Sequence, residues 1–223
     1  MQTVNICWFR RDLRLDDNAA LYYALKSKQP VVPVFIFDKH ILDELEVKAD
    51  HRVAFIHAAL TAMQEQLTAL GSSLEVYYGF PEDVYAQLLK KYKIEKVFTN
   101  GDYEPYALQR DAGIQKLLAA HGASLHSYKD QVIFEKDEVV KDDGKPYTVF
   151  TPYSRRWKAA LTDFYLKSYP VKKYLANLLQ QKPVTIPSLK SMGFIPVDTP
   201  FPSAQLNTEL VKKYKEQIGR AHV

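Results

Sequence analysis

Short apolar runs alternate along the chain with segments of helical periodicity. Five runs predict strands, which we place at 4–9, 31–37, 74–78, 97–100 and 124–128. The run at 31–37 is continuously apolar, which is typical of a strand buried on both faces. Pro33 lies inside it and has no N–H to donate, so we expect a bulge or an unpaired position there.

The segments between these runs predict helices. The clearest covers 53–70, where apolar residues recur at alternating spacings of three and four and form one stripe: Val53, Ile56, Leu60, Met63, Leu67 and Leu70. Asp50 is a suitable N-cap, and Gly71 ends the helix. Asp17 or Asn18 can cap another helix that begins at Ala19. Further helices are expected at 81–92, from Pro105 to before Gly122, at 151–166 and, weakly, at 204–217, with a hairpin turn at 141–148.

Five strand–helix alternations predict an α/β fold. Helical crossovers between strands force parallel neighbours and right-handed connections. We therefore expect a doubly wound, five-stranded parallel sheet in the order 3-2-1-4-5, Rossmann-like, followed by a linker.

Composition limits the remaining possibilities. The 223 residues are 47% hydrophobic, enough for one core. Cys7 is the single cysteine, which excludes an internal disulfide and a multi-cysteine metal site. No stretch approaches the roughly 18 apolar residues of a membrane span, and no secretory signal opens the chain. We expect a cytoplasmic protein with no membrane contact.

Charge divides the chain unevenly. From residue 167 onward there are nine basic and three acidic residues, a balance of +6, whereas the whole chain carries +4, which leaves −2 on residues 1–166. Half of the twelve prolines also lie in this tail. It is interpreted either as a solvated linker or as a track close to nucleic acid or a second domain.

Charged residues concentrate in two loops that follow strands. "CWFRRDLRLDDN" (7–18) follows the first strand, and "NGDYEPYALQRD" (100–111) follows the fourth. In the predicted order these strands are neighbours at the point where the winding reverses, which is where such sheets bind ligands. Arg10 and a wider set could all reach that cleft: Arg11, Asp12, Arg14, Asp102, Glu104 and Arg110.

Two roles compete for these charges. They can pair with one another and fix the loops together, which we weigh most heavily for Asp12, Arg14 and Asp17. Arg11 and Asp102, with Glu104, are better ligand candidates because they would point into the cleft.

Other chemistry has little support. A Gly-x-Gly-x-x-Gly after the first strand and a Walker A lysine motif are both lacking, which argues against a dinucleotide or phosphate loop. The six histidines are scattered, and His51 and His57 do not share a helix face. We assign no catalytic residue and no metal ligand.

Four ordered motifs carry a resemblance to a known family. "WFRRDLRLDDN" (8–18), "VFIFD" (34–38), "NGDYEPYALQRD" (100–111) and "YTVFTPYSRRW" (147–157) resemble the amino-terminal domain of the DNA photolyase/cryptochrome family, closest to bacterial class I cyclobutane pyrimidine dimer photolyases. The resemblance covers about residues 3–157.

The resemblance implies a domain plan. Residues 1–130 would form the core of the antenna-binding α/β domain, and 131–166 would complete it with a hairpin and a helix. Residues 167–223 would be an interdomain linker and the start of a helical domain that binds FAD and damaged DNA. We expect a monomeric, catalytically inactive fragment, cut artificially at "IGRAHV" (218–223), whose full-length parent is a DNA repair lyase.

The resemblance also implies an antenna chromophore in the cleft. Deazaflavin-type members use positions that match Arg11, Phe35, Asp38, Arg52 and Asp102, and we add Glu104 and Arg110 to this cofactor-binding set. Where folate-type members carry an Asn–Glu pair, this chain has Tyr106 and Ala107. A deazaflavin or a flavin is therefore expected in preference to a reduced folate.

Three alternatives stay open. The cleft could hold no antenna. The parent could be a signalling cryptochrome, which shares the fold without repairing DNA. The chain could also be a stand-alone nucleotide-binding α/β domain, although it lacks a glycine-rich phosphate loop.

Overall fold

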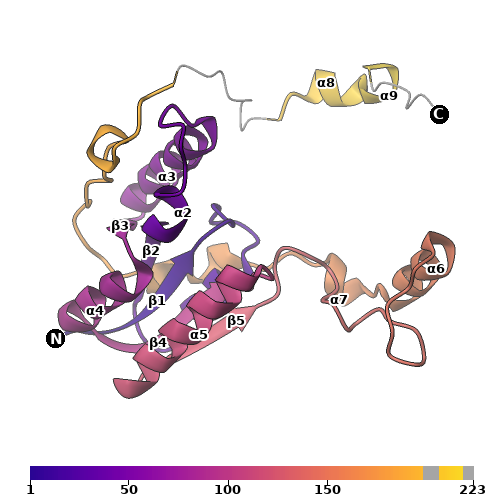
Figure 1. The fold of residues 1–223 in the computed structure, drawn as a ribbon, viewed down its shortest axis with the longest axis horizontal. Coiled ribbons are helices and arrows are strands. Elements are labelled where there is room, and N and C mark those ends of the chain that lie inside the picture. The colour runs from indigo at the N-terminus through magenta and orange to yellow at the C-terminus, as the bar shows by residue number, and fades with distance from the viewer. Residues whose placement is uncertain (198–205, 218–223) are drawn as a thin grey trace.

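A computed structural model describes residues 1–197 and 206–217 of the chain. One parallel sheet lies at its centre (Figure 1). Its strands are β1 (Thr3–Phe9), β2 (Val31–Asp38), β3 (Glu75–Gly79), β4 (Lys93–Asn100) and β5 (Ser124–Tyr128). Their spatial order is β3-β2-β1-β4-β5, which confirms the predicted topology.

Helices cover both faces of the sheet. Those of the sheet domain are α1 (Ala19–Leu25), α2 (Lys39–Leu42), α3 (His51–Ala69), α4 (Pro81–Lys91) and α5 (Pro105–Ala120). The segments that follow are α6 (Phe150–Ala160), α7 (Asp163–Leu166), the 3-10 helices η1 (Val171–Asn177) and η2 (Lys190–Met192), and α8 (Thr208–Lys212) and α9 (Tyr214–Gln217).

The sheet separates two hydrophobic clusters. Alternate residues of β1 point to opposite faces, so Cys7 and Phe9 join the cluster under α1 and α3, whereas Ile6 and Trp8 join the cluster under α4 and α5. A strand that contributes to both clusters is apolar at consecutive positions, as the β2 sequence shows. The doubly wound arrangement is therefore built into the strand sequences.

Helix starts and ends follow the residues that predicted them. Asn18, rather than Asp17, caps α1 by accepting a hydrogen bond from the Leu21 N–H at 3.0 Å. Asp50 caps α3 by accepting from the N–H groups of Arg52 and Val53. Gly71, with φ at +77°, follows the end of α3 in the left-handed region that glycine adopts easily.

Pro33 is accommodated without a bulge. The β1–β2 register runs unbroken from Asn5 and Val31 to Phe9 and Phe35. Pairing of β2 with β3 begins only at Val34, so the missing N–H interrupts no ladder on that side. Of the two predicted alternatives, the bulge is wrong, and the unpaired position is present on the β3 side.

Three other expectations need correction. The predicted helix at 151–166 is two helices, since Leu161 and Thr162 are extended. The turn at 141–148 exists, with the Gly144 N–H donating to the Lys141 carbonyl at 2.9 Å, but its flanks are not strands. The last predicted helix is two short ones, and its beginning at 204–205 lies outside the described residues.

Part of the tail packs against the sheet domain. Leu178, Met192 and Phe194 are buried in the cluster beneath α3. The Leu179 N–H donates to the Val31 carbonyl at 2.8 Å, which adds a parallel bridge to β2. This part of the tail is therefore not a fully solvated linker.

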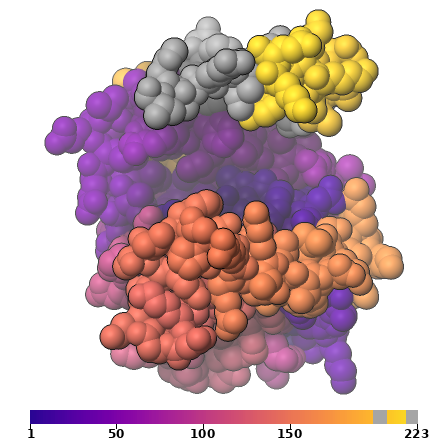
Figure 2. Space-filling view, turned by 90° about the vertical axis from the view of Figure 1, so that its right-hand side faces the viewer, coloured from indigo at the N-terminus to yellow at the C-terminus, as the bar shows by residue number. Residues whose placement is uncertain are grey.

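By contrast, α6 and α7 have no buried residue. They stand apart from the sheet in Figure 1, and Figure 2 shows them in orange in front of it. Within the described residues, we find no helix with the length and apolar character needed to cross a bilayer.

Candidate chromophore site

Sheet register brings the two charged loops together. The β1–β4 pairing ends with Trp8 beside Thr99, so the residues after each strand emerge side by side. Arg11 and Asp102 meet there, with Arg11 Nε 3.2 Å from Asp102 Oδ2. Arg11 Nη2 also lies 2.8 Å from Glu104 Oε1. The predicted meeting of the two loops at the winding reversal is present in the structure.

These three residues differ in exposure. The Asp102 side chain is buried, whereas the side chains of Arg11 and Glu104 are 54% and 63% exposed. The contact with Glu104 raises the pKa of Arg11, so the guanidinium stays charged. Because Glu104 is held only at the surface, an acidic group on a ligand could replace it.

A second group forms around Asp38 at the end of β2. The Tyr106 hydroxyl donates to Asp38 Oδ2, and Arg110 Nη1 lies 3.9 Å from the same oxygen. Burial, together with the bond to Asp38, raises the pKa of Tyr106, so its hydroxyl remains a donor. Asp38 also caps α2 by accepting from the His40 N–H at 3.0 Å.

Arg110 carries the clearest sign of an unmet hydrogen-bonding need. It is 8% exposed, and its Nη2 is buried without a hydrogen-bond acceptor among the described residues, although Asp111 Oδ1 lies 3.1 Å away as an ion pair. Arg110, Tyr106 and His40 line a cavity of about 640 Å³. A buried donor beside two aromatic rings fits a planar ligand that carries acceptor groups.

The Trp8 ring contacts two arginines, Arg10 and Arg110. The guanidinium carbons of Arg10 and Arg110 lie 5.1 and 5.0 Å from its ring centroid. Both arginines also pair with Asp111, at 2.7 Å for Arg10 and 3.1 Å for Arg110. This shared carboxylate and ring hold the arginines in place between the loops.

Two members of the predicted site lie apart from these groups. Phe35 is 6% exposed and packs edge-to-face on Phe37 in the core, so it offers a ligand little surface. Arg52, at the start of α3, pairs with Asp50 at 2.6 Å and is largely exposed. Among the described residues neither forms a hydrogen bond or ion pair with the other five.

The other charges of the first loop have structural roles, as weighed above. Asp12 accepts from the side-chain amides of Asn18 and Asn100 and from the Arg10 N–H. Arg14 pairs with Asp130 at 2.8 Å. These contacts fasten the loop to the ends of β4 and β5.

Sequence reasoning overlooked Tyr106 as a partner of Asp38, and also Asn100 and Asp111. Asn100 ends β4 beside the first loop, so its position was a usable signal. The Tyr106 contact depends on the angle at which α5 leaves the sheet, which no local pattern reports.

Comparison with known proteins agrees with this arrangement. The family model described as DNA photolyase matches residues 5–173, which include both loops. A deoxyribodipyrimidine photo-lyase from Synechococcus sp. (strain ATCC 27144) is 30% identical over 222 residues, covering 96% of this chain and 45% of that protein. An uncharacterised 31.6 kDa protein from Synechococcus sp. (strain PCC 6716) is 36% identical over 156 residues, covering 70% of this chain and 55% of the relative. The chain thus spans about half the length of these relatives.

Solved structures give the same answer for the fold. An archaeal photolyase from Sulfolobus tokodaii, described with two FAD molecules and the implication of a novel light-harvesting cofactor, superimposes with a TM-score of 0.53 at 34% identity, covering 58% of this chain and 30% of that one. A class III photolyase from Agrobacterium tumefaciens matches 97% of this chain and 42% of its own with a TM-score of 0.71 at 23% identity, which supports the fold alone. The chain belongs to the DNA photolyase family.

Proposed function

We propose that this chain is the antenna side of a DNA photolyase that uses light to repair cyclobutane pyrimidine dimers. The observation that carries the proposal is the family match over residues 5–173, which spans both cleft loops. Three of the relatives are named deoxyribodipyrimidine photo-lyase. Cryptochromes from Gallus gallus also match, at 28% identity over about a third of their length, and are the weaker alternative.

The chain's own part in this function is to hold an antenna chromophore. When bound, such a group absorbs light and transfers the excitation to a second flavin. Arg11 would pair with an acidic group of the chromophore, and Arg110 Nη2 would donate to a ring acceptor. Excitation transfer needs a fixed distance and orientation rather than an acid or a nucleophile, so residues that only bind and orient are sufficient.

The chromophore class follows from the residues at the start of α5. Ala107 is 3% exposed and offers no polar side chain, and the Tyr106 hydroxyl is already bonded to Asp38. Neither residue supplies the amide and carboxylate of folate-type members. A deazaflavin or a flavin is the better fit to the arginines and the cavity beside them.

We place FAD and damaged DNA in the part of the longer relatives that the match does not cover, and we assign residues 167–223 to the connection that leads to it. We also propose that the protein acts in the cytoplasm, as a monomer.

Chromophore titration tests the proposal. Fluorescence anisotropy of 8-hydroxy-5-deazaflavin, FMN and methenyltetrahydrofolate against the purified chain should show binding of the first or second, at least about tenfold tighter than the folate, a difference of about 1.4 kcal/mol. The proposal would be contradicted if the folded chain bound none of the three chromophores at 100 µM, which we take as roughly the weakest dissociation constant for a functional site.

Glu104→Gln should strengthen chromophore binding rather than weaken it. It frees Arg11 from its exposed partner, so a chromophore with an acidic group should bind several-fold more tightly. Arg11→Gln should weaken binding by about tenfold, the value of one charge-assisted contact. Arg155→Gln, at an exposed position of α6, is the control and should change nothing.

A further inference from the structure

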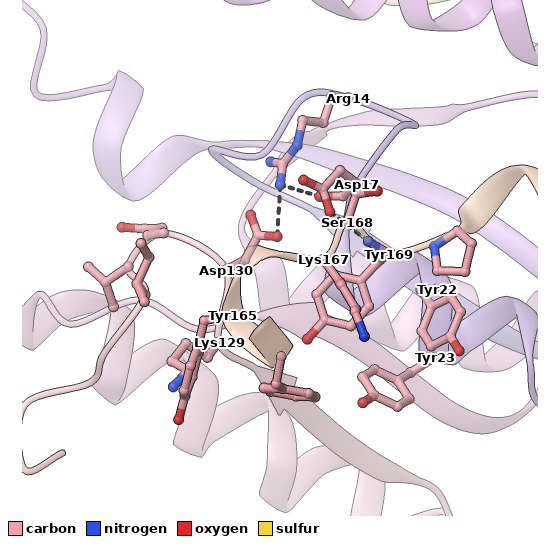
Figure 3. Close-up of a pocket in the computed structure, with 15 residues that line it drawn as sticks. Arg14, Asp17, Tyr22, Tyr23, Lys129, Asp130, Tyr165, Lys167, Ser168 and Tyr169 are labelled. Carbon is pink, nitrogen blue, oxygen red and sulfur yellow. Dashed lines mark hydrogen bonds and ion pairs between the residues drawn. The ribbon is translucent and has the colours of Figure 1, made fainter. Parts of the chain in front are cut away.

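A separate cavity of about 580 Å³ lies between α1 and the segment 164–170 (Figure 3). None of the seven predicted chromophore residues lines it. Its walls come from α1, from the loop after β5 and from α7 with the strand-like segment that follows. Its size is in the range of small-ligand sites.

Aromatic rings form both walls. On the α1 side, Tyr23 stacks on Tyr128 with 4.4 Å between centroids and 11° between planes, and the ring remains 37% exposed. Tyr169 lies 6.0 Å from Tyr23. On the other side are Tyr165 and Phe164, the latter 68% exposed. A flat ligand between these walls would remove several partly exposed rings from water.

Two of the charged groups that line the cavity, Asp17 and Lys167, make no ion pair among the described residues, and Asp17 accepts a hydrogen bond from the Tyr169 N–H. Arg14 and Asp130 neutralise each other at 2.8 Å. Lys129 pairs with Glu138 at 2.5 Å. Lys167, labelled in Figure 3, is therefore the lining cation that has no ion-pair partner within the part of the chain that the structure describes. Its ammonium lies beside aromatic walls, where it can meet one anionic group of a ligand.

The segment that closes the cavity is held to the first charged loop. The Tyr169 N–H donates to Asp17 Oδ1 at 2.7 Å. Asp17 has φ at +48°, a left-handed conformation that aspartate tolerates better than most residues. Two positions later Val171 is buried in the core, and η1 packs on α1. Tyr169 is therefore fixed at both ends, and the aromatic wall is preformed.

We propose that this cavity binds a planar aromatic ligand with a single anionic substituent, of the nucleoside monophosphate class. The ring lies against Tyr23, and the phosphate meets Lys167. The proposal does not depend on an antenna chromophore, because the two sites share no residue.

Saturation-transfer NMR with AMP and adenosine tests it, with affinities from isothermal titration. Saturation should pass from the protein to the base protons of AMP, as expected if the base contacts the aromatic wall. Tyr23→Leu should weaken AMP binding at least about tenfold. Tyr153→Leu is a matched control, since Tyr153 on α6 is also 37% exposed, and it should leave affinity unchanged. Phe164→Ala, at a position too exposed to unfold the chain, should weaken AMP several-fold.

Lys167→Gln separates phosphate from base recognition. It should weaken AMP about fivefold and leave adenosine unchanged. Arg11→Gln should leave AMP binding intact, so failure of the chromophore proposal and failure of this one are distinguishable. Lack of AMP binding at millimolar concentration, or equal effects of Tyr23→Leu and Tyr153→Leu, would overturn the proposal.

Discussion

Asp12 shows why so much opposite charge follows the first strand. Asp12 is buried, at 8% exposure. Its carboxylate accepts hydrogen bonds from the side-chain amides of Asn18 and Asn100 and from the Arg10 N–H. A buried charge is tolerated when hydrogen bonds surround it. The loop therefore carries charge partly to build its own shape, and Arg11 is the arginine of this loop that we assign to the chromophore.

Replacing Asp12 by Asn tests this role. In Asp12→Asn, the NH₂ group of the new amide would face the N–H groups that now donate to the carboxylate, and a hydrogen bond would be lost. The free energy of unfolding should therefore fall by about 2 kcal/mol. Asp16→Asn makes the same change in the same loop, where the side chain is 69% exposed, and should cost less than about 0.5 kcal/mol. Urea unfolding followed by circular dichroism measures both, and equal costs would contradict the assignment.

Asp50 links stability to pH. The hydrogen bond from Arg52, with those from the N–H groups of Arg52 and Val53, lowers its pKa to about 2. A carboxylate with a lowered pKa stabilises the fold fully above its ordinary pKa near 3.8 and loses that contribution as the pH falls toward 2. Asp50→Ala should therefore cost about 1 kcal/mol at pH 7. The cost should shrink between pH 4 and pH 2 in urea titrations, and a cost independent of pH would refute this.

Individual residues were predictable where register determined them. Arg11 and Asp102 follow neighbouring parallel strands, so their meeting required only the strand order. Phe35 was expected beside a ring, but its position in β2 directs it into the core. The contacts of Asp38 with Tyr106 and Arg110 depend on how α5 packs, which sequence periodicity does not specify.

At the level of elements, hydrophobic pattern and capping residues predicted the sheet domain well. The strand at 93–100 was expected only from residue 97, because three of its first four residues, Lys93, Glu95 and Lys96, are charged. The helix predicted at 151–166 was too long because neither glycine nor proline marks the break in the sequence. Leu161 and Thr162 are extended there, and the structure offers no local cause.

The tail segment 171–195 makes an element-level prediction. Phe194 is 4% exposed, whereas its neighbour Ile195 is 59% exposed. Phe194→Ala should lower the free energy of unfolding by about 3 kcal/mol through lost packing, and Ile195→Ala should have an effect below about 0.5 kcal/mol. Thermal unfolding of both variants compares them directly, and similar melting temperatures would mean that the tail does not stabilise the domain.

For the whole molecule, the sheet places the candidate chromophore site and a second, open cavity at its carboxyl edge. Arg11, on the first loop, and Arg110, on α5, both lie within the family match, and α6 and α7 present exposed apolar side chains such as Phe150 and Leu166. This chain covers 45% of the Synechococcus photo-lyase, and we propose that the remainder of such a longer protein covers this surface. Affinity of this chain for its chromophore should therefore be weaker than that of a full-length protein.

Two-dimensional NMR of the ¹⁵N-labelled chain titrated with 8-hydroxy-5-deazaflavin tests the central claim most directly. We predict that shift changes concentrate on the amides near Arg11, Asp102 and Arg110. The amides of Glu75 and Tyr92 should stay unchanged, because these residues, whose side chains are hydrogen-bonded to each other, lie at the opposite edge of the sheet, where β3 and β4 begin. Changes confined to that opposite edge, or the absence of any change with a folded chain, would contradict the claim that the two loops form a chromophore site.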